Sequence, residues 1–124
     1  MIFTVEMVIA VHERLIETSG GELGIKDVTL IDSAISSIYQ TFDGKELYPT
    51  VIEKAARLCF ALNRNHAFID GNKRISVPML GLFLRFHEID YAPSIVDVVR
   101  VGLSLANNSM TYDDLLIWLN KVTQ

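Results

Sequence analysis

Apolar residues recur at intervals of three and four along almost the whole chain, and this spacing constrains the fold more than any other feature of the sequence. Sustained alternation of polar and apolar residues, which would indicate a half-buried strand, is absent. There is no internal repeat of about thirty residues and no low-complexity tract. The sequence therefore predicts an all-α protein, a compact bundle of about six helices, with a loop or small β-hairpin near residues 41–48 as its only strand content.

Capping residues and turns divide this pattern into six helical segments. Thr4 and Thr50 are placed to cap the first and third helices, and Glu53 completes a capping box with Thr50. Pro78 falls inside the fourth helix, where its missing N–H is expected to bend or tighten the helix. The expected helices run from 4 to the glycines at 20–21, over 30–38, from 50 to 63–65, from 72 to about 87, from 93–94 to 107–109, and over 112–119.

Length and composition favour one packed domain spanning residues 1–124. Half of the 124 residues are hydrophobic and 21% are charged, which is enough apolar surface for a single core. A net charge of −4 argues against a protein that binds nucleic acid by neutralising its phosphates. Cys59 is the only cysteine, which excludes an internal disulfide and favours a reducing compartment. Without a signal-like N-terminus or a membrane-spanning apolar run, a soluble, cytoplasmic protein with no membrane contact is expected.

The most informative segment for function is His66–Arg74, which reads His-Ala-Phe-Ile-Asp-Gly-Asn-Lys-Arg and leads into the start of the most apolar helix. A helix N-terminus presents unpaired backbone N–H groups and a partial positive charge, which together can bind an anion. Gly71 and Asn72 fall at that position, and glycine allows the backbone to approach a phosphate closely. Lys73 and Arg74 add two cations suited to phosphate oxygens.

The same segment contains an acid and a base. A carboxylate beside phosphates needs a bridging cation, so Asp70 is the candidate Mg²⁺ ligand. His66 carries an imidazole, the side chain most often used as a general base, and is placed to take a proton from an incoming hydroxyl. Phe68 is expected to anchor the loop in the core and so aim His66. Each of these residue types alone is more often structural, but their order within one short segment favours a phosphate-handling active site.

His-x-Phe-x-Asp-Gly-Asn-Lys-Arg resembles the signature of the Fic/Doc superfamily, in its death-on-curing (Doc) branch. Supporting similarities lie at 24–27, 41–42, 46–50 and 53–56. The resemblance implies a single domain with the small all-helical Fic core, and it implies the toxin of a bacterial toxin–antitoxin pair with a Phd-like antitoxin as partner. It also places the loop at 42–48 where Fic enzymes have the flap that lines the target groove, although a plain connecting loop is an equal alternative.

Lys73 decides which reaction the resemblance implies. Adenylylating Fic enzymes usually have glycine at this position, and a further arginine where Val77 stands. In the Doc branch, lysine is associated with a nucleotide bound the other way round, with its γ-phosphate towards the acceptor. The resemblance therefore implies an ATP- and Mg²⁺-dependent protein kinase acting on a threonine hydroxyl of the translation factor EF-Tu. It assigns the roles of base to His66, metal ligand to Asp70, phosphate cradle to Gly71 and Asn72, and phosphate contacts to Lys73 and Arg74.

Three alternatives to a kinase remain open. The first is a protein adenylyltransferase, which would transfer AMP to a hydroxyl. The second is a non-catalytic nucleotide- or partner-binding module, against which the intact His66 and Asp70 count. The third is a nuclease-type toxin, which the pI of about 5.2 and the lack of a carboxylate cluster disfavour. His12 and His87 are interpreted as packing or capping residues.

Overall fold

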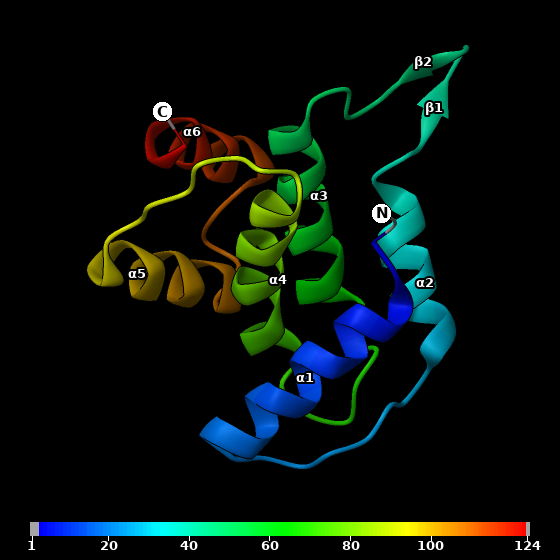
Figure 1. Cartoon of the computed structure of the whole chain (residues 1–124), viewed down its shortest axis with the longest axis vertical. Helices are drawn as coiled ribbons and strands as arrows, with labels where there is room; N and C mark the ends of the chain where they lie inside the picture. The colour runs from blue at the N-terminus through cyan, green and yellow to red at the C-terminus, as the bar shows by residue number, and fades with distance from the viewer. Residues whose placement is uncertain (1–2, 124) are drawn as a thin grey trace.

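A computed structural model describes residues 3–123, which form six helices and one two-stranded hairpin (Figure 1). The elements are α1 (Val5–Ser19), α2 (Val28–Ser37), β1 (Thr41–Phe42), β2 (Lys45–Glu46), α3 (Val51–Arg64), α4 (Asn72–Phe86), α5 (Ile95–Ala106) and α6 (Tyr112–Val122). The predicted all-α bundle with a small hairpin is confirmed. Within residues 3–123, no helix combines the length and the apolar character needed to cross a bilayer.

Side chains at the helix starts explain most of these boundaries. Five helices begin after a residue whose side chain accepts a backbone N–H of the first turn: Thr4, Asp27, Thr50, Ser94 and Thr111. A cap of this kind contributes about 1 kcal/mol to helix stability. The predicted capping roles of Thr4 and Thr50 are confirmed, and α2 starts at Val28 rather than at residue 30 because Asp27 caps it. Among the six helices of the described range, only α4 has no side-chain cap.

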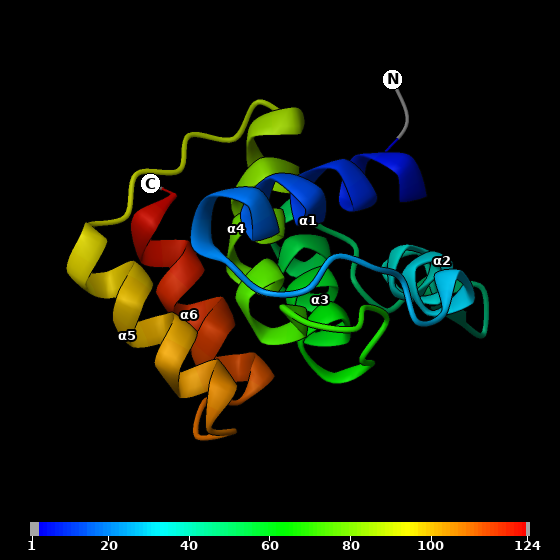
Figure 2. The same cartoon turned by 90° about the horizontal axis from the view of Figure 1, so that it is seen from below.

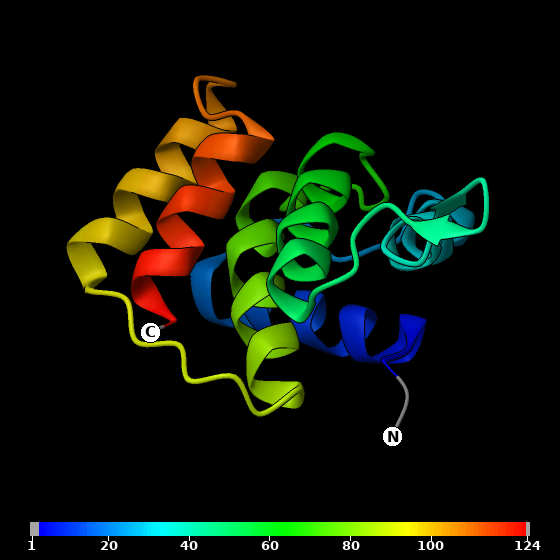
Figure 3. The same ribbon diagram turned by 90° about the horizontal axis from the view of Figure 1, so that it is seen from above.

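Helices α3 and α4 form the centre of the molecule. Figures 2 and 3 show α5 and α6 on one side of this pair and α2 on the other. Helix α1 packs against α2 and α4, while α5 contacts α4 and α6 contacts α3. The side chains of Leu80, Phe83 and Leu84 in α4 are fully buried, which confirms that α4 is the central helix. Pro78 lies on the exposed side of α4, and the helix continues past it.

The hairpin of β1 and β2 lies far from the segment that connects α3 to α4. The two strands pair antiparallel through a turn at Asp43 and Gly44, whose φ angles of 53° and 76° are those of a tight hairpin turn. Figure 1 places the hairpin at one end of α2 and α3, and the connecting segment 65–71 at the opposite end. The hairpin is therefore present as predicted, but this arrangement does not bring it beside His66, as the expected flap role would need.

Candidate active site

The segment between α3 and α4, here called the motif loop (residues 65–71), is closed by a pair of hydrogen bonds. The Asn72 side chain accepts the Phe68 N–H and donates to the Phe68 carbonyl, both at 2.8 Å. The Phe68 ring is 2% exposed, so the predicted anchoring of the loop in the core is confirmed. The Asn72 side chain is thereby occupied in holding the loop, which leaves its backbone N–H as the group available to an anion.

The chain between α1 and α2 braces the motif loop from outside. The Ile69 N–H donates to the Gly24 carbonyl at 3.1 Å, and the Lys26 N–H donates to the Ala67 carbonyl at 2.9 Å. Gly24 has a φ of 136°, and a β-carbon there would lie 2.6 Å from Ile69 Cδ1. A side chain at residue 24 would need a φ that residues other than glycine rarely adopt, and it would displace the end of the Ile69 side chain.

His12 of α1 supports the motif loop from inside the core. Its ring is 1% exposed and stacks on Phe68 with 3.7 Å between ring centroids and 8° between planes. Its Nε2 lies 2.7 Å from the Asp70 carbonyl oxygen. Because a carbonyl oxygen can only accept a hydrogen bond, Nε2 carries the proton and donates it. The predicted packing role of His12 is confirmed, and the structure adds a hydrogen bond that positions the backbone between Asp70 and Gly71.

Replacing His12 by phenylalanine separates the contribution of the ring stack on Phe68 from that of the hydrogen bond to the Asp70 carbonyl. We expect His12→Phe to keep the stack on Phe68 but to lower the free energy of unfolding by about 1–2 kcal/mol, because the Asp70 carbonyl loses its donor. Urea denaturation of the purified protein measures this difference. The matched control is His87→Phe at the exposed end of α4, which should change stability by less than about 0.5 kcal/mol. Equal unfolding free energies for both variants would contradict a role for the hydrogen bond.

Asp70 is held as a carboxylate by its neighbours. Its Oδ2 accepts the Glu22 N–H at 3.2 Å, its Oδ1 accepts the Gly71 N–H at 2.8 Å, and Arg74 Nη2 lies 3.5 Å from Oδ1. The two backbone N–H groups, that of Glu22 first, and the Arg74 guanidinium keep the pKa of Asp70 below its usual value. The carboxylate is therefore ionised at neutral pH, which a metal ligand requires.

The donor set around Asp70 suits a cation that is also held by its substrate. Among residues 3–123, no group of three or more His, Cys, Asp or Glu side chains is arranged to hold a metal ion. The Asp70 side chain is 45% exposed and keeps lone pairs on the solvent side. Mg²⁺ is commonly bound by one or two carboxylates together with substrate phosphates, and one exposed carboxylate beside an anion site fits that pattern.

The N-terminus of α4 lies where the sequence predicts an anion site. The first-turn N–H groups of a helix have no intrahelical acceptor. Here no side chain caps them either, and the residue before the helix, Gly71, has a φ of 79° and a ψ of 14°. Lys73 is exposed and forms no ion pair with any residue in the range 3–123. Arg74 instead turns towards the end of α1, where Nη1 donates to Ser19 Oγ at 3.0 Å and to the Gly20 carbonyl at 2.9 Å.

His66 has an unusual backbone conformation. Its φ is 54°, in the left-handed region, which costs a residue with a side chain roughly 1–2 kcal/mol. Its ring is exposed and forms no hydrogen bond with the rest of the described chain. Backbone strain of this kind collects at functional sites, where the surrounding structure maintains it. Because the ring is exposed and has no partner among the described residues, it is accessible to a substrate.

Reasoning from the sequence missed the contribution of the α1–α2 connection. Gly20 and Gly21 were interpreted only as the end of α1, yet a β-carbon on Gly21 would lie 2.6 Å from Asp70 Oδ2 and 2.8 Å from Arg74 Nη2. The next residue supplies the backbone N–H that Asp70 accepts. In the sequence, only the pair of glycines hinted at this contact. No local pattern connects the pair with a motif about fifty residues later.

Comparison with known proteins agrees with the motif and the fold. Residues 2–84 match the sequence profile of the Fic/DOC family, a range that covers α1 to α3, the motif loop and most of α4. A relative described as Toxin Doc, from Mycolicibacterium smegmatis, is 40% identical over 94 residues, which cover 76% of this chain and 71% of the relative. The site described above lies entirely within the range that matches the family.

Proposed function

The chain belongs to the Fic/DOC family, and from that premise we propose that it is a bacterial toxin that transfers the γ-phosphate of ATP to a Ser or Thr hydroxyl of a protein. The observation that carries this proposal is the uncapped N-terminus of α4, with an exposed Lys73 beside it and an ionised Asp70 at its start. Such an arrangement suits the phosphates of a nucleotide. The relative named Toxin Doc supports the proposed role as a toxin.

In this proposal the N–H groups of the first turn of α4 bind phosphate oxygens, and Lys73 contributes a mobile positive charge. Asp70 would hold Mg²⁺, which when bound neutralises charge on the phosphates. Arg74 stabilises the site through its contacts to Ser19, Gly20 and Asp70, so its first role is to hold the Asp70 carboxylate and the end of α1 together.

His66 would act as the general base. The acceptor oxygen forms a bond to the γ-phosphorus while the bond from that phosphorus to the β–γ bridging oxygen breaks, and ADP leaves. The hydroxyl proton passes to the exposed His66 ring, which has no competing partner in the described chain. The backbone conformation of His66, with its φ of 54°, also supports this assignment, because strain of this kind collects at functional sites.

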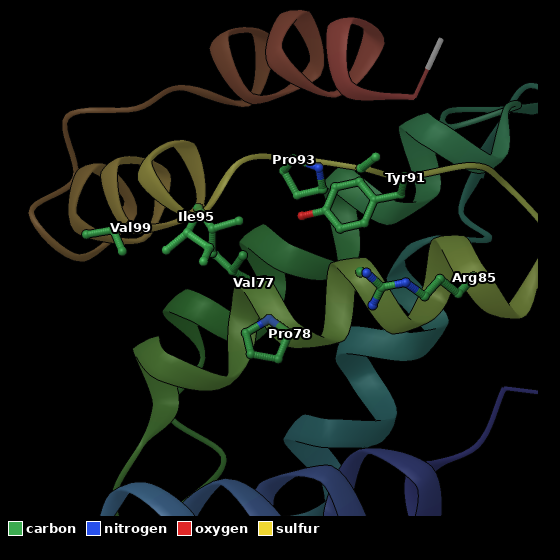
Figure 4. Close-up of a pocket in the computed structure, with 10 residues that line it drawn as sticks. Val77, Pro78, Arg85, Tyr91, Pro93, Ile95 and Val99 are labelled. Carbon is green, nitrogen blue, oxygen red and sulfur yellow. The ribbon is translucent and has the colours of Figure 1, made fainter.

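We further propose an EF-Tu-like translation factor as the acceptor and a Phd-like antitoxin as the partner, both from the resemblance of the motif to the Doc branch. A hollow of about 400 Å³ between α4 and α5, which Figure 4 shows with Val77, Pro78 and Tyr91 at its wall, supports a protein partner. Two exposed apolar residues of α5, Ile95 and Val99, also line it. The chain would act in the cytoplasm, where a translation factor is found.

Labelled ATP distinguishes the proposed reaction from adenylylation. We expect label from the γ position, but not from the α position, to appear on one protein when the purified chain is added to bacterial extract with Mg²⁺. Gel autoradiography after the two parallel incubations measures this. Label arriving from the α position would establish adenylyl transfer instead. Absence of label from both positions would leave the binding-module alternative.

A further inference from the structure

A stripe of α3 that plays no part in the site above separates two hollows on the surface. Arg57, Phe60 and Arg64 follow one another at helical spacing and line both hollows. The hollow towards α2 has a volume of about 300 Å³ and also contains Ser37. The other, towards the start of α6, has a volume of about 490 Å³ and also contains Tyr48. The two hollows and the stripe between them are called the arginine groove below.

The arginine groove contains two positive charges and no carboxylate that would neutralise them. No Asp or Glu lines either hollow, although the whole chain has a net charge of −4. Arg57 Nε donates to Ser37 Oγ at 3.3 Å, and its guanidinium lies 5.7 Å from the centroid of the Tyr48 ring. The Arg64 guanidinium lies 4.9 Å from the centroid of the Phe60 ring. Both cations are thus held by neutral groups and, within the described residues, form no ion pair.

One end of the arginine groove is formed by the two residues that directly precede the proposed base in the chain. Arg64 and Asn65 line the hollow beside α2, and His66 is the next residue in the chain. The Asn65 amide donates to the Leu30 carbonyl at 2.7 Å, while its Oδ1 is buried with no donor among the described residues. A buried acceptor without an N–H partner is costly, so this end of the groove holds an unsatisfied polar atom under its surface.

We propose that the arginine groove binds an acidic segment of the protein that accepts the phosphoryl group, and so guides its hydroxyl to His66. This inference rests on the proposed function for its acceptor. The two arginines lie about 10 Å apart along α3, at about 1.5 Å per residue, which is the length of about three residues of extended chain. The acceptor should therefore carry Asp or Glu side chains within about five residues of the reacting Ser or Thr. The net negative charge of the chain disfavours nucleic acid as the occupant.

The first test measures binding without catalysis. The probe is a fluorescein-labelled peptide of twelve residues with one central Thr and four Asp or Glu, compared with a counterpart in which these are Asn or Gln. By fluorescence anisotropy, the wild type should bind the acidic peptide at least tenfold more tightly. The double variant Arg57→Gln, Arg64→Gln should lose this preference, whereas Arg14→Gln, Lys121→Gln, with the same charge change at exposed positions outside the groove, should keep it.

The second test uses transfer of label to the acceptor in bacterial extract. For the Arg57→Gln, Arg64→Gln variant, the amount of extract that gives half-maximal transfer should rise at least tenfold, while the half-saturating ATP concentration stays within twofold. Added salt should weaken the wild type more than the variant, because screening acts on the charges that the variant lacks. Arg57→Lys keeps a positive charge, so the amount of extract that it needs should lie between the amounts for the wild type and for the Arg57→Gln, Arg64→Gln variant. This intermediate value separates the loss of charge from a folding defect.

Several outcomes would overturn the inference. Equal binding of the acidic and neutral peptides by the wild type, or equal transfer by the two double variants, would show that the groove does not select an acceptor. A twelve-nucleotide RNA that competes as well as the acidic peptide would assign the groove to another class of partner. If the wild type transfers no label, the proposed function fails, and the peptide measurement still decides whether the arginine groove binds an acidic chain.

Discussion

His66→Asn should reduce transfer of the γ-phosphate by about 10²–10⁴-fold while leaving the protein as stable as the wild type. The amide cannot take the proton of the acceptor hydroxyl. Asparagine does, however, tolerate the left-handed conformation that residue 66 adopts, with its φ of 54°, better than most residues. The loss should therefore appear in the rate of label transfer and not in the urea midpoint. This pairing distinguishes a chemical role of His66 from a structural one.

The control for this experiment is His87→Asn at the C-terminal end of α4. His87 is exposed and packs on Phe83 and Phe86, at the opposite end of α4 from the motif loop. The His87→Asn variant should transfer label at a rate within about twofold of the wild-type rate, since a surface substitution away from the site changes little. Retention of more than a tenth of the wild-type rate by His66→Asn would contradict the assignment of His66 as the base.

Gly21→Ala should lower transfer by about 10²-fold, although residue 21 lies outside the motif, because small displacements of reacting groups have effects of this size. The new β-carbon would lie 2.6 Å from Asp70 Oδ2 and 2.8 Å from Arg74 Nη2, well inside van der Waals contact. Both atoms are at the ends of side chains and can move, so the fold should survive. The carboxylate proposed to hold Mg²⁺ would be displaced in the process.

Gly20→Ala is the matched control. Alanine at residue 20 would have the same backbone strain as alanine at residue 21, but it would not approach Asp70 or Arg74. Gly20 and Gly21 have φ angles of 86° and 115°, and both should lose roughly 1–2 kcal/mol of stability on gaining a side chain. A β-carbon on Gly20 meets nothing within 4 Å. Urea denaturation should therefore show similar losses for the two variants, while only Gly21→Ala loses most of its transfer rate. Equal transfer rates would show that the position of Asp70 is immaterial.

The helices were predictable because the signals that specify them are local. Apolar spacing of three and four residues marks the buried face of a helix, and Thr4 and Thr50 cap their own first turns. Two boundaries differ from the prediction. Helix α2 starts two residues early because the Asp27 side chain caps it, and α6 continues to Val122 instead of ending at residue 119. The hairpin was visible in the Asp43–Gly44 turn because that signal is also local.

The sequence by itself determined the helical architecture and the chemistry available in the motif loop, because the loop and the start of α4 are contiguous in the chain. Only the tertiary structure decided how those residues are used. Packing of α1 against α4 brings His12 to the Asp70 carbonyl and turns Arg74 towards Ser19, and the chain after α1 supplies an N–H to Asp70. These hydrogen bonds join residues about fifty positions apart, so they depend on how the helices pack and not on local spacing.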